Sequence, residues 1–281
     1  MKKEISVVIL TAQGPRHSYF CYELAKHYSI RGVVVDDRYH WGDRLWTLLK
    51  INGFHPARIF RSFLLKKQSA PYEERDRKTE EKFFPPPTHE FPVGIPILRS
   101  RDPNDEKTIS WIQKLSPEVI VVFGTRLLRE PVLRLARFGA LNLHTGLSPF
   151  YRGGQCTFWC LDEGDLDHLG VTVHHLSQKI DGGDIVYTAQ PEVEPGDTVR
   201  SLECKLVRLG ADLMIRAVSE IREGTAPRVT QRGKGKLFLS KMFTLEKRLE
   251  LEKKLEEGWI TKLLEGRGAP AVVEPRYEEK N

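Results

Sequence analysis

Residues 139–190 read GALNLHTGLSPFYRGGQCTFWCLDEGDLDHLGVTVHHLSQKIDGGDIVYTAQ. The stretch opens with an apolar run that ends in Asn142 and His144, two positions apart. Side chains alternate between the two faces of a strand, so this pair points to the same side of a sheet. A glycine-rich turn carries Asp181 and can bring its carboxylate close to the pair. Carboxamide, imidazole and carboxylate together are suited to acyl transfer.

The chain before this stretch alternates short β-branched runs with segments of helical periodicity. This alternation predicts an α/β fold: an open, mostly parallel, twisted sheet with helices on both faces. Ligands of such sheets bind at the carboxyl ends of the strands, so we expect Gly124-Thr125-Arg126 and Asn142-Leu143-His144 to share one pocket. We expect strands over residues 5–11, 33–35, 94–99, 118–124 and 138–143, and helices over residues 17–28, 105–115 (capped by Asn104 or Asp102) and 127–135.

The first strand and helix lack the G-x-G-x-x-G loop of dinucleotide-binding folds, which disfavours a nicotinamide cofactor. Asp36 and Asp37 follow the second strand, and we interpret them as a solvated strand end rather than a ribose-binding site. The charged segment 66–90 is interpreted as a helix and a loop on the surface, with charges that face solvent.

Residues 197–222 have the periodicity of a long helix that ends at Gly224 and packs back on the sheet. We therefore divide the chain into a domain of residues 1–224 and a small C-terminal strand-helix appendage of residues 225–281. The leucines of the appendage fit a core contact or a homodimer interface equally well. Within the appendage we expect a strand at 237–239, an amphipathic helix at 244–257 and a short helix at 259–264.

Composition excludes few classes of function. The formal net charge of +6 is compatible with an anionic substrate or a nucleic acid without requiring either. Four scattered cysteines lack the spacing of a zinc site, so we expect reduced thiols and no metal. No apolar run approaches the roughly 20 residues that span a bilayer, and no signal-peptide cleavage site follows the first apolar run. We expect a cytoplasmic protein without a membrane partner.

Transfer of a one-carbon acyl group to an amine passes through a tetrahedral intermediate. A site for this reaction needs a donor for the oxyanion, a group that moves the amine proton, and a group that orients it. An Asn side chain supplies an N–H donor, a His shuttles protons, and a carboxylate fixes the His tautomer. Neither a metal nor a covalent nucleophile is needed.

The order of motifs resembles the folate-dependent formyltransferase family, which includes methionyl-tRNA, glycinamide-ribonucleotide and sugar-nucleotide formyltransferases. The chain departs from the family pattern at Gly146 and Ser148, where Ser-Leu-Leu-Pro is usual, and this departure concerns acceptor choice more than chemistry. The resemblance implies a Rossmann-like formyltransferase fold. The matching segments are Asn142-Leu143-His144, Pro149-Phe150-Tyr151-Arg152-Gly153, Gly170-Val171-Thr172 and Asp181-Gly182-Gly183.

The same resemblance implies 10-formyltetrahydrofolate as the formyl donor. It implies Asn142 and His144 at the formyl carbon, with Asp181 rather than Asp184 orienting His144 or relaying protons through water. The implied folate contacts are Gly124, Arg126, Leu127, Leu128, Gln178 and Ile180, and the implied acceptor contacts are Tyr151, Arg152 and Gly153.

Several side chains near these motifs have a second interpretation. Arg152 either binds an acceptor phosphate or pairs with a local acid. His174 and His175 lie on an expected strand, where at most one of them faces the core, and we interpret both as structural.

We expect the acceptor to be a primary amine of a small molecule, in the first place an amino-sugar nucleotide. Family members that act on tRNA usually carry a longer C-terminal β-barrel, whereas the residues after Gly224 predict one strand and helices. Two alternatives stay open. One is a methionyl-tRNA formyltransferase with a shortened C-terminal region, and the other is a hydrolase of the same fold that releases formate.

Overall fold

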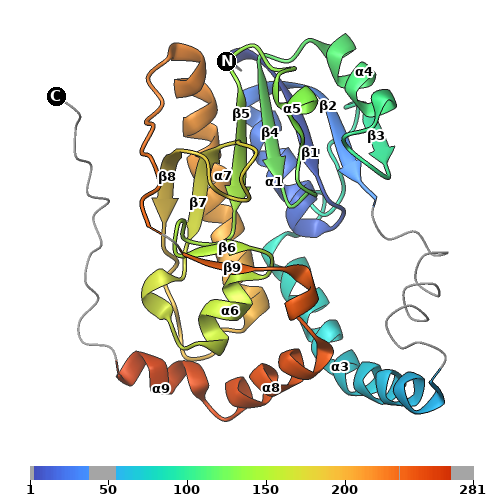
Figure 1. Ribbon diagram of the computed structural model, residues 1–281, viewed down its shortest axis with the longest axis vertical. Helices are drawn as coiled ribbons and strands as arrows, with labels where there is room; N and C mark the ends of the chain where they lie inside the picture. Colours follow the sequence, from blue (N-terminus) through green and yellow to red (C-terminus); the bar gives the residue numbers. More distant parts are fainter. Residues whose placement is uncertain (1–2, 38–54, 234, 267–281) are drawn as a thin grey trace.

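The computed structural model describes residues 3–37, 55–233 and 235–266. A seven-stranded sheet, in the order β3-β2-β1-β4-β5-β7-β8, lies between two layers of helices (Figure 1). Strands β1 to β5 are parallel, and β7 is antiparallel to both of its neighbours. The predicted α/β fold is confirmed. The strands are β1 Lys3–Thr11, β2 Tyr28–Asp36, β3 Ile97–Ser100, β4 Val119–Phe123, β5 Ala140–His144, β7 Val171–His175 and β8 Ile185–Ala189.

Alternate residues of the strands enter two separate apolar layers. Val7 and Ile9 of β1 pack with α1 (Pro15–His27) and α7 (Val199–Glu223). Val8 and Leu10 pack with α4 (Glu106–Leu115) and α5 (Glu130–Leu133) on the other face. Full burial of such a side chain stabilises the fold by about 1.5–3 kcal/mol. The two layers therefore fix which face each strand residue occupies, including the polar residues of β5.

The start of α4 differs from the sequence prediction. Asp105, not Asn104 or Asp102, caps the helix, because its carboxylate accepts the N–H of Thr108 at 2.7 Å. Asn104 instead accepts the N–H of Arg129 and donates to the carbonyl oxygen of Leu127. These bonds hold the segment before α5 as a loop, so α5 begins at Glu130 rather than at residue 127.

Three elements escaped the sequence analysis: β6 (Tyr151–Gly153), α6 (Cys156–Asp162) and β8. Every residue from Cys156 to Leu161 is buried, so α6 has no polar face and no amphipathic pattern. β6 pairs in parallel with β9 (Lys236–Phe238), the strand that the sequence predicts at 237–239. This pairing joins the C-terminal residues to the loop that follows β5.

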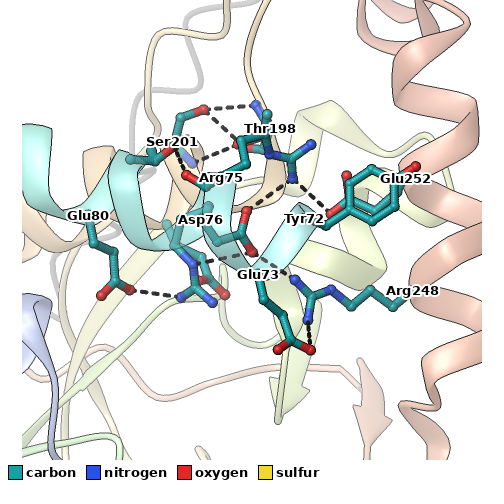
Figure 2. Close-up of polar contacts among 12 residues, drawn as sticks. Tyr72, Glu73, Arg75, Asp76, Glu80, Thr198, Ser201, Arg248 and Glu252 are labelled. Carbon is teal, nitrogen blue, oxygen red and sulfur yellow. Dashed lines mark hydrogen bonds and ion pairs between the residues drawn. The ribbon is translucent and has the colours of Figure 1, made fainter. Parts of the chain in front are cut away.

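The charged segment forms the long helix α3 (Pro56–Phe83), which packs against α7 and α8 (Leu245–Glu256). The predicted solvent-facing charges are found at Arg77 and Lys78, but the prediction is wrong for Asp76, which is buried. Figure 2 shows Asp76 between Arg75 of its own helix and Arg248 of α8. Sequence alone does not show that α8 brings a cation to this helix.

The end of the described chain continues from α8 into α9 (Trp259–Glu265). Leu251 of α8 is buried, and Leu255 packs against the core, so a core contact accounts for this part of the leucine stripe. Residues 267–281 of the expected appendage lie outside the described residues.

Candidate active site

Four polar side chains share one face of β5 and β7. The antiparallel register places Asn142 opposite His174 and His144 opposite Thr172. The residues between them on each strand are apolar and enter the core on the other face. Period-2 alternation therefore gathers a carboxamide, two imidazoles and a hydroxyl on one surface.

The loop between β7 and β8 brings Asp181 to this surface. Asp181 adopts a left-handed backbone conformation with φ of 45°, which Asp tolerates better than most residues. One carboxylate oxygen, Oδ2, lies 3.6 Å from Nδ1 of His144 and accepts the N–H of Gly153 at 2.8 Å. The other, Oδ1, lies 3.5 Å from Nε2 of His174. One carboxylate therefore contacts both histidines and β6.

The loop is held in this position by the segment before β9. The Gln231 side chain donates to the carbonyl oxygens of Asp181 and Gly183, at 2.8 Å and 2.7 Å. Asp184, the alternative acid, lies 3.9 Å from Arg228 instead. Asp181 is thus the acid of this turn that the structure brings to His144.

Opposing effects act on the Asp181 carboxyl. Burial alone would raise its pKa, but the charge of a protonated His144 and the hydrogen bond from the Gly153 N–H hold the pKa below its ordinary value. The ionised form of Asp181 is therefore favoured. An ionised carboxylate in this position can attract and orient a protonated imidazole.

The His144 ring lies between two oxygen acceptors. Its Nε2 is 3.0 Å from the carbonyl oxygen of Tyr151, to which it donates, and its Nδ1 faces Asp181. The thiol of Cys156 lies 3.6 Å from the same Nε2. Acceptors at both ring nitrogens suit a protonated imidazole, so His144 is placed to hold and deliver a proton.

A chain of hydrogen bonds orients the Asn142 side chain. Nδ1 of His174 lies 2.9 Å from the carbonyl oxygen of His175, so Nδ1 carries the hydrogen. The other ring nitrogen, Nε2, then accepts from Nδ2 of Asn142 at 3.0 Å. The second N–H of Asn142 faces Asp181 at 3.5 Å, a long contact that leaves it able to turn to another acceptor.

The three candidate acceptor-binding residues form β6 and contribute differently. Tyr151 contacts the site through its carbonyl oxygen, whereas its ring is buried against Phe238 and its hydroxyl bonds to Glu163. Gly153 contributes its N–H to Asp181. Arg152 lies between them, and its buried Nε has no hydrogen-bond partner among the described residues.

A family model described as formyl transferase matches residues 62–218 of this chain. This match spans more than half of the chain and includes Asn142, His144, His174 and Asp181. The chain belongs to the formyltransferase family. Among the described residues, no group of three or more His, Cys, Asp or Glu side chains could hold a metal ion.

Individual relatives agree with this family. The methionyl-tRNA formyltransferase of Halothermothrix orenii is 34% identical over 162 residues, which cover 56% of this chain and 51% of the relative. The chain thus spans about half the length of the curated relatives it matches.

Two solved structures share the fold at lower identity. A sugar N-formyltransferase from Shewanella has a TM-score of 0.56 at 14% identity, covering 88% of this chain and 86% of its own. The N-formyltransferase from Helicobacter canadensis, in complex with folinic acid and dTDP-3-aminofucose, has a TM-score of 0.51 at 13% identity, covering 87% and 73%.

Two loops of this family member carry the candidate folate contacts. Gln178, after β7, donates to Glu130, after β4, at 2.9 Å, so the loops lie side by side. Leu127 and Ile180 are exposed, one on each loop, and offer apolar surface to a flat heterocycle. The side chain of Leu128 is buried in the apolar layer beneath. Exposed apolar side chains therefore lie on two neighbouring loops.

Arg126, two residues after Gly124 in the first loop, is held by Asp36 at the end of β2. The guanidinium Nη2 of Arg126 lies 2.8 Å from Oδ1 of Asp36, and the backbone N–H of Arg126 donates to Oδ2 of Asp36 at 2.9 Å. Asp36 is only 3% exposed, so the interpretation of this residue as a solvated strand end is wrong. The carboxylate positions the loop that the sequence assigned to folate.

His174 is the site residue that sequence reasoning missed. It was interpreted as structural, yet it contacts both Asn142 and Asp181. A signal was present in the sequence: His174 and Thr172 are two positions apart with valines on either side of Thr172, the same alternation that places Asn142 and His144 together.

Proposed function

We propose that this protein transfers a formyl group from 10-formyltetrahydrofolate to a primary amine. The observation that carries the proposal is the contact of Asn142, His144 and Asp181 on one polar surface, inside the segment that matches the formyltransferase family. The three groups have the functions that acyl transfer to nitrogen requires.

Each side chain has a separate task in the proposed reaction. The Asn142 N–H that makes the long contact to Asp181 turns to the formyl oxygen and donates to it as negative charge develops there. His144 delivers or removes the proton at the reacting nitrogen, and Asp181 keeps the ring oriented. His174 holds the Asn142 carboxamide in place. The bound co-substrate supplies the formyl group, between the loops of Leu127 and Ile180.

We further propose an amino-sugar nucleotide as the acceptor. Arg152 lies between the two β6 residues that contact His144 and Asp181, and its Nε is unpartnered among the described residues. A guanidinium in this place suits a phosphate group of the acceptor. The fold neighbour that binds dTDP-3-aminofucose supports this class of acceptor. In this proposal residues 1–224 form the catalytic domain and residues 225–281 the appendage.

A second candidate acceptor is methionyl-tRNA, because the curated relatives that match this chain are methionyl-tRNA formyltransferases. The two acceptors differ in charge. A tRNA would contact many phosphates, so its binding would weaken steeply with salt, whereas a nucleotide sugar presents a single diphosphate.

The test is incubation of the full chain with 10-formyltetrahydrofolate and a panel of 3-amino- and 4-amino-sugar nucleotides, with products read by mass. We expect a gain of one formyl group on one member of the panel. Product with methionyl-tRNA alone would reverse the order of acceptors. Formate released without any formylated amine would overturn the transferase proposal in favour of hydrolysis. Arg152→Gln should raise KM for the acceptor and leave KM for the folate unchanged.

A further inference from the structure

The first half of α3 has four apolar side chains exposed on one arc of the helix. Ile59, Phe60, Phe63 and Leu64 are 44%, 63%, 63% and 41% exposed. Their spacings of three and four residues place them side by side along the helix. Single exposed apolar residues are ordinary, but a contiguous group on one face marks a binding surface. We call these four residues the α3 patch.

Cations surround the α3 patch. The segment from Ala57 to Lys67 contains Arg58, Arg61, Lys66 and Lys67 and no acid. The helix begins without a side-chain cap and without an acid in its first turn. Of these cations, Arg58 lies in the first turn, where a positive charge opposes the helix dipole. In water this half of α3 therefore combines exposed apolar area with unfavourable charge, and a partner that is both apolar and anionic would relieve both.

The second half of α3 is fixed to the body of the protein, as Figure 2 shows. Asp76 accepts hydrogen bonds from Arg75 and from Arg248 of α8, each at 3.0 Å. Arg75 also donates to Glu252 at 2.9 Å, and Tyr72 donates to Glu256 at 2.9 Å. These contacts hold the helix from Tyr72 onward, and in the first half Nε of Arg61 lies 3.6 Å from Oε1 of Glu246 of α8. The first half extends from this anchor, away from the sheet (Figure 1), as a helix that is already formed.

We propose that the α3 patch and its cations bind the surface of an anionic lipid membrane, with α3 lying in the plane of the interface. The apolar arc enters the boundary between headgroups and acyl chains, and the cations contact lipid phosphates. The inference goes beyond the proposed function and does not rest on it. No helix within the described residues is long and apolar enough to cross a membrane, and an interfacial helix needs no such length.

Two other partners fit this surface less well. In a symmetric dimer the same patch meets itself, which would set cations against cations. The acids farther along α3 do not offset them, because Glu74 and Glu81 already bond to Arg77, and Glu80 lies 3.2 Å from Arg16. A nucleic acid would neutralise the cations but would leave the apolar arc without a hydrocarbon partner.

The test is flotation of the full chain with vesicles of phosphatidylcholine, with or without about one third phosphatidylglycerol. We expect binding to the anionic vesicles alone, weakened by salt. Phe60→Ser with Phe63→Ser should reduce vesicle binding at least about tenfold, because two large apolar groups no longer enter the lipid. Removal of two cations by Lys66→Gln with Lys67→Gln should reduce it about 25-fold, since each contributes about fivefold.

Matched controls lie outside the α3 patch. Val93→Ser removes an apolar side chain that is 97% exposed, and Lys253→Gln removes a cation that is 78% exposed. Both variants should bind vesicles like the wild type, and circular dichroism should show unchanged helix content in all four.

Three results would overturn the proposal. The first is a wild type that does not bind anionic vesicles at low salt, or a Phe60→Ser, Phe63→Ser variant that binds them unchanged. The second is a wild-type dimer that becomes monomeric in that variant without any lipid binding, which would assign the α3 patch to a second copy. The third is salt-sensitive binding to RNA without binding to vesicles.

Discussion

Replacing Gly146 by alanine should displace the His144 ring. A Cβ atom at Gly146 would lie 2.9 Å from Cβ of Cys156 and 2.9 Å from the carbonyl oxygen of Tyr151, and closer still to Nε2 of His144. Carbon contacts are normally about 3.5–4.0 Å, so the new methyl group overlaps three neighbours at once. Cys156 is fully buried in α6, and the Tyr151 carbonyl belongs to the paired strand β6. The imidazole is therefore the group that must move.

The overlap requires a shift of about 1 Å, and misplacement of a reacting group by about that distance can lower a rate about 100-fold. We expect kcat/KM for formyl transfer to fall about 100-fold in Gly146→Ala. Overpacking should lower the free energy of unfolding by about 1–3 kcal/mol, which leaves the variant folded. Turnover is measured with the acceptor found in the panel. Nitrogen-15 NMR of the His144 ring reports its changed hydrogen bonding and needs no acceptor.

Gly154→Ala is the matched control for this prediction. A Cβ atom at Gly154 would meet only Oγ of Ser240, at 3.6 Å, which is an ordinary contact. The control should therefore keep wild-type turnover and stability. The reasoning is refuted if Gly146→Ala keeps wild-type kcat/KM, or if Gly154→Ala loses as much activity.

Three further predictions concern single side chains. His144→Ala should lower turnover by about 10²–10⁴ while calorimetry shows near-normal binding of 10-formyltetrahydrofolate, and wild-type turnover in this variant would contradict the proposed proton transfer. Asp181→Asn should make the free energy of unfolding, measured in urea, fall less steeply below about pH 4 than in the wild type. The reason is that folding lowers the pKa of the Asp181 carboxyl, so its ionised form stabilises the fold above the ordinary pKa of Asp, and this stabilisation is lost as the pH falls. Parallel curves of unfolding free energy against pH for the two proteins would argue against this reasoning. Asp76→Ala should lower the free energy of unfolding by about 1–3 kcal/mol, because Arg75 and Arg248 each lose one hydrogen-bond acceptor, whereas Glu257→Ala on the surface should change it by less than about 0.5 kcal/mol. Equal effects of these two variants would refute a structural role for Asp76.

The parts of the fold that were predictable are those fixed by local alternation. β4 and β5 are short apolar runs, and the two-residue spacing of Asn142 and His144 already places their side chains on one face. Which residues of β5 are buried can be predicted from its own sequence, without knowing which strands lie beside it. For this reason strands β1 to β5 and the first two site residues follow from the sequence.

The contacts that complete the site depend on residues far apart in the chain. His174 reaches Asn142 only because β7 runs antiparallel to β5 in one particular register. Asp181 reaches His144 because its loop folds back and Gln231, 50 residues later, holds the loop there. No periodicity in residues 171–184 encodes either choice. The buried charges of α3 were misjudged for the same reason, since their partners come from α7 and α8.

The pairing of β6 with β9 connects the proposed division of the chain to the site. β6 supplies the carbonyl that accepts from His144 and the N–H that donates to Asp181, and it has only three residues. Such a short strand is not stable alone and relies on its partner. The partner is β9, which packs so closely that a Cβ at Gly153 would overlap the carbonyl oxygen of Phe238. Residues after Gly224 therefore position backbone groups around His144 and Asp181, and the appendage supports the site although none of its side chains is placed in the chemistry.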